Sequence, residues 1–292
     1  MKTWDSAWSK IRKRRMDVWR ELRLDLPFEY DHLDPDAYFS SFLVENPPDD
    51  PDIVLERVDR DRLWASEIVI TSQKYFHVLR LTSQRAADGH ITWAATDAHH
   101  AVLLGVRCFL STLGVCICQG KHRAHLVDLR PERGSPQDEK AFKKAYRNAP
   151  NPVRVLTPDT HEMGQKQIFD LFTRLLRTVI PSDECAKLIQ DITALKLGAH
   201  KSERNRLLYH SHYWHWPEDI NWPAIDLGIR DDRGLGAEGL TKDFFVLSLV
   251  AKLVENNVRP VSEYLQIKDT FFEPLYHDQR CTPDVLSCIP VG

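Results

Sequence analysis

The sequence predicts a mainly α protein, and three observations support this interpretation. Apolar residues recur at helical spacing through most long segments, and segments that favour strands are short and lie near the middle of the chain. Hydrophobic residues make up 42% and charged residues 28% of the 292 positions, which is typical of a globular protein and excludes a disordered one. We predict three regions: a basic helix with an acidic, proline-rich connector (1–62), a helical region with short strands (63–158), and an up-and-down helical bundle (159–292).

The first region combines two opposite charge runs. Residues 10–23 carry seven bases and two acids, with tryptophans at helical spacing beside them. Residues 25–61 carry twelve acids, two bases and five prolines, so we expect an irregular connector. The basic helix folds back on the acidic segment or contacts RNA phosphates, and the neighbouring acids favour the first alternative. In the second, the RNA-binding residues are those of the densest positive cluster, Arg12, Lys13, Arg14 and Arg15.

The second region begins with a clear helical stripe, formed by Trp64, Ile68, Ser72, Tyr75, Phe76 and Leu79. Asp97 is expected to cap a second, apolar helix that runs to about Leu113. On that helix one narrow sector is polar, and it contains His100, Arg107 and Ser111. Such a stripe in an apolar helix is either a satisfied buried network or the wall of a site, and we favour the network.

The least helical stretch lies between residues 119 and 158. We predict short strands at His125–Leu129 and Val153–Leu156, with a basic helix at Glu139–Arg147 between them.

The third region returns to regular helices. The Asp159-x-x-Glu162 pattern resembles a capping box, a clean helical period follows over residues 168–180, and Pro181 ends it. A second helix starts near Ser182, and Thr241 opens a last helix that extends to about Leu265.

Several common chemistries are excluded or disfavoured. A formal net charge of −3 does not mark a general polyanion binder. The Gly-rich pattern at 234–239 lacks a βαβ context, so we interpret it as a flexible loop rather than a dinucleotide site. The spacing of the histidines at 200, 210, 212 and 215 suits no helical face, so we expect no metal and no cofactor.

The location predicted from sequence is the cytoplasm. The first residues contain no apolar segment of the kind that a secretory signal needs. The longest apolar stretch, Ala101 to Cys118, contains Arg107 and two glycines, and we expect a buried helix there rather than a membrane span. The six cysteines are scattered, so we expect reduced thiols that act mostly as small core residues.

The most informative motif is Arg204-Asn205-x4-His210, which is followed by Ser211, His212, Tyr213 and Trp214. It resembles the Arg-Asn-x4-His signature of the HEPN superfamily, a set of compact helical bundles that includes many metal-independent ribonucleases. The resemblance covers about residues 159–265. It implies that Arg204, Asn205 and His210 form the catalytic group, while Arg206 and His212 are a competing register and Tyr209 and Tyr213 are secondary candidates.

The residue types suit RNA cleavage without a metal. A neutral histidine can accept the 2′-hydroxyl proton, and a protonated one can donate to the leaving oxygen. An arginine fork can hold the phosphate oxygens. Six residues turn about 240° around a helix, so Arg204 and His210 do not share one face. Either the helix loosens near Tyr209, or two protomers each contribute an Arg–His pair to a shared cleft, as members of this superfamily typically do.

The resemblance implies an endoribonuclease with an RNA substrate, a homodimer, and a role as a toxin or phage-defence effector with a cognate regulator or antitoxin. The alternative is a non-catalytic HEPN-like module for dimerisation or regulatory binding, in which His210 bonds within an aromatic cluster. A further alternative is an unrelated helical protein.

Overall fold

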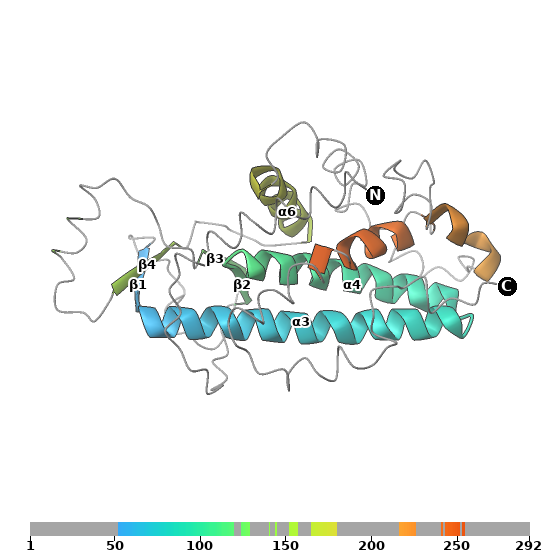
Figure 1. Cartoon of the computed structure of the whole chain (residues 1–292), viewed down its shortest axis with the longest axis horizontal. Helices are drawn as coiled ribbons and strands as arrows, with labels where there is room; N and C mark the ends of the chain where they lie inside the picture. The colour runs from blue at the N-terminus through green and yellow to red at the C-terminus, as the bar shows by residue number, and fades with distance from the viewer. Residues whose placement is uncertain are drawn as a thin grey trace.

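The protein is mainly α in the part of the chain that the structure describes. The computed structural model describes residues 52–119, 124–128, 140, 144, 152–156, 165–179, 216–225, 241, 243–251, 253 and 254. Two long helices dominate this part, and a four-stranded sheet lies at one end of them (Figure 1). Lys140 and Lys144, within the predicted basic helix, are helical and exposed.

The two long helices form an antiparallel hairpin. Helix α3 spans Arg57–Ala87 and helix α4 spans Ile91–Thr112 (Figure 1). Gly89 adopts a φ of 78°, a left-handed conformation that costs glycine little. The N–H groups of Gly89 and His90 donate to the carbonyls of Ala86 and Arg85, so a Schellman motif ends α3 and reverses the chain.

The predicted stripe on the first helix is confirmed. Its six residues, from Trp64 to Leu79, are buried, and Tyr75 and Ser72 are fully inaccessible. They face α4 and share the core with alanines and other small residues of that helix, which allow the two backbones to approach closely.

The four strands form one antiparallel sheet in the order β1-β4-β3-β2. Their bounds are Asp52–Glu56 (β1), Val115–Gln119 (β2), Ala124–Asp128 (β3) and Pro152–Leu156 (β4). One row crosses the whole sheet, because Leu156 is the partner of both Asp52 and Asp128, and Asp128 also pairs with Val115. The two strands predicted from sequence correspond to β3 and β4, so that prediction is confirmed within one residue.

Three boundary predictions were wrong. The segment expected to be an irregular connector up to residue 62 contains β1 and the start of α3, because β4 supplies hydrogen-bonding partners from about a hundred positions away. Helix α4 begins at Ile91, not at Asp97, which lies inside the helix and forms an ion pair with Arg85. The apolar run after Ala101 is not a single helix, since Gly114, with a φ of 82°, ends α4 and the chain continues as β2.

The C-terminal helices share the hairpin's core. Helix α6 spans Gln165–Val179, as its apolar period and Pro181 predict, and its Phe172 packs edge-on against Phe109 of α4. Residues 241, 243–251, 253 and 254 are helical, as predicted for the last helix, and this helix lies along α4 (Figure 1). The division predicted between 158 and 159 stays a prediction.

At Gly105, α4 lies close to both the last helix and α3. A Cβ at this position would lie 2.5 Å from Cγ1 of Val250 and 2.8 Å from Cε2 of Tyr75. Because real Cβ atoms do not approach other atoms this closely, only glycine fits at this crossing.

We predict that Gly105→Ala destabilises the protein by about 1–3 kcal/mol, because overpacking outweighs the gain in helix propensity of about 1 kcal/mol. Urea denaturation measures the difference. Val250→Ala in the same chain should recover part of the loss. An unchanged or raised unfolding free energy for the single variant would show that the last helix does not pack at Gly105.

Candidate functional site

A polar cluster lies between α3 and α4 at the sheet end of the hairpin. Thr71 of α3 and Ser111 of α4 are buried, and their hydroxyl oxygens are 3.1 Å apart. Thr71 also donates to the carbonyl of Glu67 at 2.6 Å, and Ser111 donates to that of Cys108 at 2.7 Å. These hydroxyls bond to backbone carbonyls inside their own helices and meet at the helix interface.

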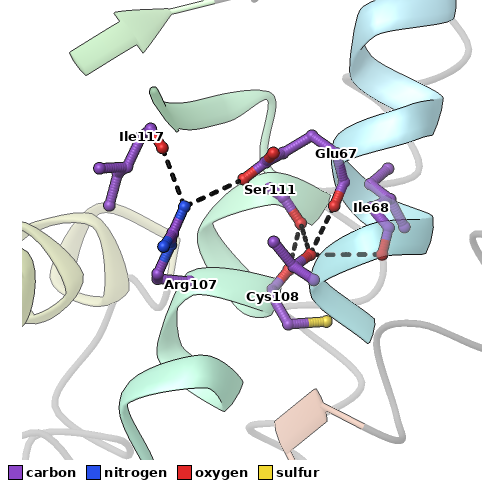
Figure 2. Close-up of polar contacts among 7 residues, drawn as sticks. Glu67, Ile68, Arg107, Cys108, Ser111 and Ile117 are labelled. Atoms are coloured by element: carbon purple, nitrogen blue, oxygen red, sulfur yellow. Dashed lines mark hydrogen bonds and ion pairs between the residues drawn. The ribbon is translucent and has the colours of Figure 1, made fainter. Parts of the chain in front are cut away.

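Arg107 connects three elements of the fold (Figure 2). Its Nη2 donates to the carbonyl of Ile117 on β2 at 2.9 Å and lies 3.8 Å from Oε1 of Glu67 on α3. The Glu67 side chain is 8% exposed. Burial of a carboxylate is unfavourable unless a cation lies nearby. The guanidinium thereby lies beside the buried carboxylate and donates a hydrogen bond to a backbone carbonyl of β2, which is an edge strand of the described sheet.

The end of α4 is tied to α3 by a tryptophan. The indole N–H of Trp64 donates to the carbonyl of Ser111 at 2.5 Å. The N–H of Gly114 also donates to this carbonyl, which belongs to the last turn and has no partner within an ideal helix. Trp64 therefore holds the last turn of α4 against α3.

Cys108 is a buried thiol in the same cluster. Burial raises its pKa to about 12, although side-chain hydrogen bonds with Ser72 and Thr71 act in the opposite direction. Its Sγ lies 3.3 Å from Oγ of Ser72. Cys116 and Cys118 are also buried, so these three cysteines are the small core residues that the sequence predicts.

The arrangement favours a structural role for this polar cluster. Ser111 is buried and hydrogen-bonded, as the alternative favoured from the sequence requires, whereas Arg107 is half-buried with no hydrogen-bond partner for its Nε, and His100 is exposed at the surface. Sequence reasoning missed Glu67, because a glutamate 40 positions before Arg107 gives no local signal of the pairing.

A second polar contact connects α4 to the last helix. Nε2 of His99 lies 3.9 Å from Oδ2 of Asp243, and both side chains are largely buried. Nearby, the N–H of Asn221 donates to Oγ1 of Thr241 at 3.1 Å, and the rings of Trp222 and Phe244 are in edge contact. These contacts fix the start of the last helix against α4 and the short 216–225 segment.

The site residues predicted from the sequence motif lie outside the described residues. This holds for the whole set: Arg204, Asn205, Arg206, Tyr209, His210, His212, Tyr213, and the basic cluster Arg12, Lys13, Arg14 and Arg15. The Gly-rich pattern at 234–239 and the histidine at 200 lie outside them as well.

Within the described ranges, no three His, Cys, Asp or Glu side chains come together as metal ligands. Among the same residues, no helix has both the length and the apolar character to cross a bilayer. Comparisons with protein families, curated proteins and solved structures find no match to this chain.

We predict that Arg107→Gln lowers the free energy of unfolding by about 2–3 kcal/mol, because the substitution leaves the buried Glu67 carboxyl without its nearby cation. Urea denaturation of Arg107→Gln, Glu67→Gln and the double variant gives the coupling between the two side chains. The double variant should be more stable than the sum of the single losses implies. Lys74→Gln on an exposed position of α3 is the matched control and should change stability by less than about 0.5 kcal/mol. Strict additivity would contradict the pairing.

We predict that native Cys108 resists alkylation. A pKa of about 12 leaves roughly one thiol in ten thousand ionised at pH 8, and the side chain is inaccessible. Iodoacetamide labelling followed by peptide mapping should find Cys108 unmodified in the folded protein and modified in urea. Equal labelling under both conditions would show that the α3–α4 interface opens readily.

Proposed function

We propose that this protein is a metal-independent endoribonuclease that cleaves RNA by attack of the 2′-hydroxyl on the adjacent phosphate. The observation that carries the proposal is the Arg204-Asn205-x4-His210 motif, with its resemblance to the HEPN superfamily. A bundle of the HEPN type, a homodimer, and a role in toxicity or phage defence under a cognate regulator belong to the same proposal.

The helices on either side of the motif support the proposal. Helix α6 precedes the motif and the helical residues 241–254 follow it, with 242 and 252 outside the described set. Both contact α4, through Phe172 and through Val250. A helical bundle that carries a motif between its helices needs this kind of flanking structure.

The hydroxyls and the thiol of the polar cluster are poor catalytic groups. Thr71, Ser72 and Ser111 donate their hydroxyl protons to backbone carbonyls. The raised pKa of Cys108 disfavours its thiolate, so it is a poor nucleophile. No metal-ligand cluster occurs among these residues. The motif, which lies outside the described residues, therefore stays the candidate on which the proposal rests.

The roles in the proposed reaction follow from the side chains. Neutral His210 accepts the 2′-hydroxyl proton, or protonated His210 donates a proton to the leaving 5′-oxygen. Arg204 binds the phosphate oxygens and offsets the charge that develops on them. If each protomer of a dimer supplies one such pair, a shared cleft holds both an acceptor and a donor of protons.

We predict that the purified protein cleaves RNA in EDTA and leaves 2′,3′-cyclic phosphate ends. Arg204→Ala and His210→Ala should each lower the cleavage rate by about a hundredfold or more, the usual contribution of a positioned acid or base. Product ends are identified by mass spectrometry of a defined oligonucleotide.

His90→Ala is the matched control, because His90 is an exposed histidine that precedes α4 and makes no side-chain capping bond. Arg206→Ala and His212→Ala test the competing register. Cleavage that requires a divalent metal would contradict the mechanism. Intact RNA with a folded dimer would favour the non-catalytic dimerisation or regulatory module.

A further inference from the structure

The connection between β3 and β4 carries two exposed lysines at helical spacing. The chain leaves β3 at Asp128 and enters β4 at Pro152, and these two strands are neighbours in the sheet. Between them, Lys140 and Lys144 are helical and exposed. Four positions along a helix correspond to a rise of about 6 Å and a rotation of about 40°, so helical geometry places both lysines on one face.

The sequence around these lysines extends the positive charge. Residues three or four positions apart are neighbours on a helix surface, and at these spacings Lys140 is followed by Lys143 and Lys144, and Lys144 by Arg147. Glu139 lies four positions before Lys143, a spacing that favours an ion pair with that lysine. The pattern therefore leaves Lys140, Lys144 and Arg147 without an acidic residue at helical spacing.

The structure gives Lys140 and Lys144 no acidic partner among the described residues. Helix α6 offers a contrast, because its exposed Lys166 is followed four positions later by exposed Asp170. At Lys140 the same spacing brings a second cation instead. Like charges at this spacing disfavour the helix, and an anion bound between them relieves the repulsion.

The charge on this face favours a polyanion over a small anion. A strand of nucleic acid meets several cations at once and releases the counterions condensed on its phosphates. The competing polyanion is the acidic segment 25–61 of this chain. Its acids in the described part, Glu56, Asp59 and Asp61, form no ion pair with either lysine, which favours nucleic acid.

We infer that the face formed by Lys140 and Lys144 binds the phosphate backbone of RNA. This inference rests on the proposed ribonuclease function and assigns part of the substrate to the connection between β3 and β4, which is separate in sequence from the proposed catalytic motif. Phosphate contacts position a strand and carry no base sequence. The face therefore holds RNA without selecting the bond that is cut.

The test measures how RNA binding depends on salt. The probe is a fluorescein-labelled 15-nucleotide uridylate with 2′-O-methyl groups, which cannot be cleaved by 2′-hydroxyl attack. Its binding to the full chain is measured by fluorescence anisotropy in EDTA at several salt concentrations. Lys140→Gln and Lys144→Gln should each lower the slope of log affinity against log salt by about 0.7, and the double variant by about 1.4, because each removes one phosphate contact.

Two further variants separate charge from structure. Replacing both lysines by arginine keeps the charge and should keep the slope. Lys166→Gln removes the same charge from an exposed position of α6 that has Asp170 at helical spacing, and it should leave the slope unchanged. Thermal melting verifies the fold of each variant, and the single variants carry the test if the double variant unfolds.

Three results would overturn the inference: absence of probe binding by the wild-type chain, an unchanged slope in the glutamine variants, or an equal change in Lys166→Gln. A lower melting temperature of the glutamine variants with an unchanged slope would overturn it in favour of the acidic segment as the partner of these lysines.

Cleavage of a dinucleotide, which has a single internucleotide phosphate, reports on the proposed chemistry alone. If the dinucleotide is cut and the glutamine variants bind the long probe normally, this inference fails and the ribonuclease stands. If the probe binds through the two lysines and neither the dinucleotide nor long RNA is cut, the inference stands and the ribonuclease fails.

Discussion

The guanidinium of Arg107 joins the helical hairpin to the sheet. It extends from α4 to a carboxylate of α3 and to a backbone carbonyl of β2, so one side chain connects three elements. Arginine suits this role because its planar fork presents several donors in fixed directions. The hydroxyl contacts of Thr71 and Ser111 and the indole of Trp64 lie beside it, so the chain passes from α4 into β2 at a defined place.

Helix interiors were easier to predict from the sequence than the places where helices begin. The apolar stripe from Trp64 to Leu79 was sufficient to predict the buried face of α3, and Pro181 gave the end of α6. The start of α4 was not predictable in the same way, because Asp97 resembles an N-cap and its actual partner, Arg85, lies on another helix. Strand β1 was hidden in an acidic segment, since the pairing that makes it a strand comes from β4.

The candidate sites also differ in how far the sequence predicted them. The Arg204-Asn205-x4-His210 motif is a sequence observation, and its residues lie outside the described part of the chain. The polar stripe of α4 was visible in the sequence, but its division into buried Ser111, half-buried Arg107 and exposed His100 depends on α3 and β2. The exposure of Trp93 had no sequence signal, because a tryptophan in an apolar helix is usually expected in the core.

The pairing of β1 with β4 has a consequence for how the chain folds. Asp52 is the partner of Leu156, so this one contact closes a loop of about a hundred residues that contains the whole hairpin, β2 and β3. Closing so long a loop is slow and entropically unfavourable, whereas the α3–α4 turn at Gly89 brings its partners together locally. We therefore expect the hairpin to form while the chain is still being synthesised, and the sheet to close only after β4 has emerged. During that interval the edge of β1 is without its partner. Association with other chains through β1 is therefore most favoured at this stage of synthesis.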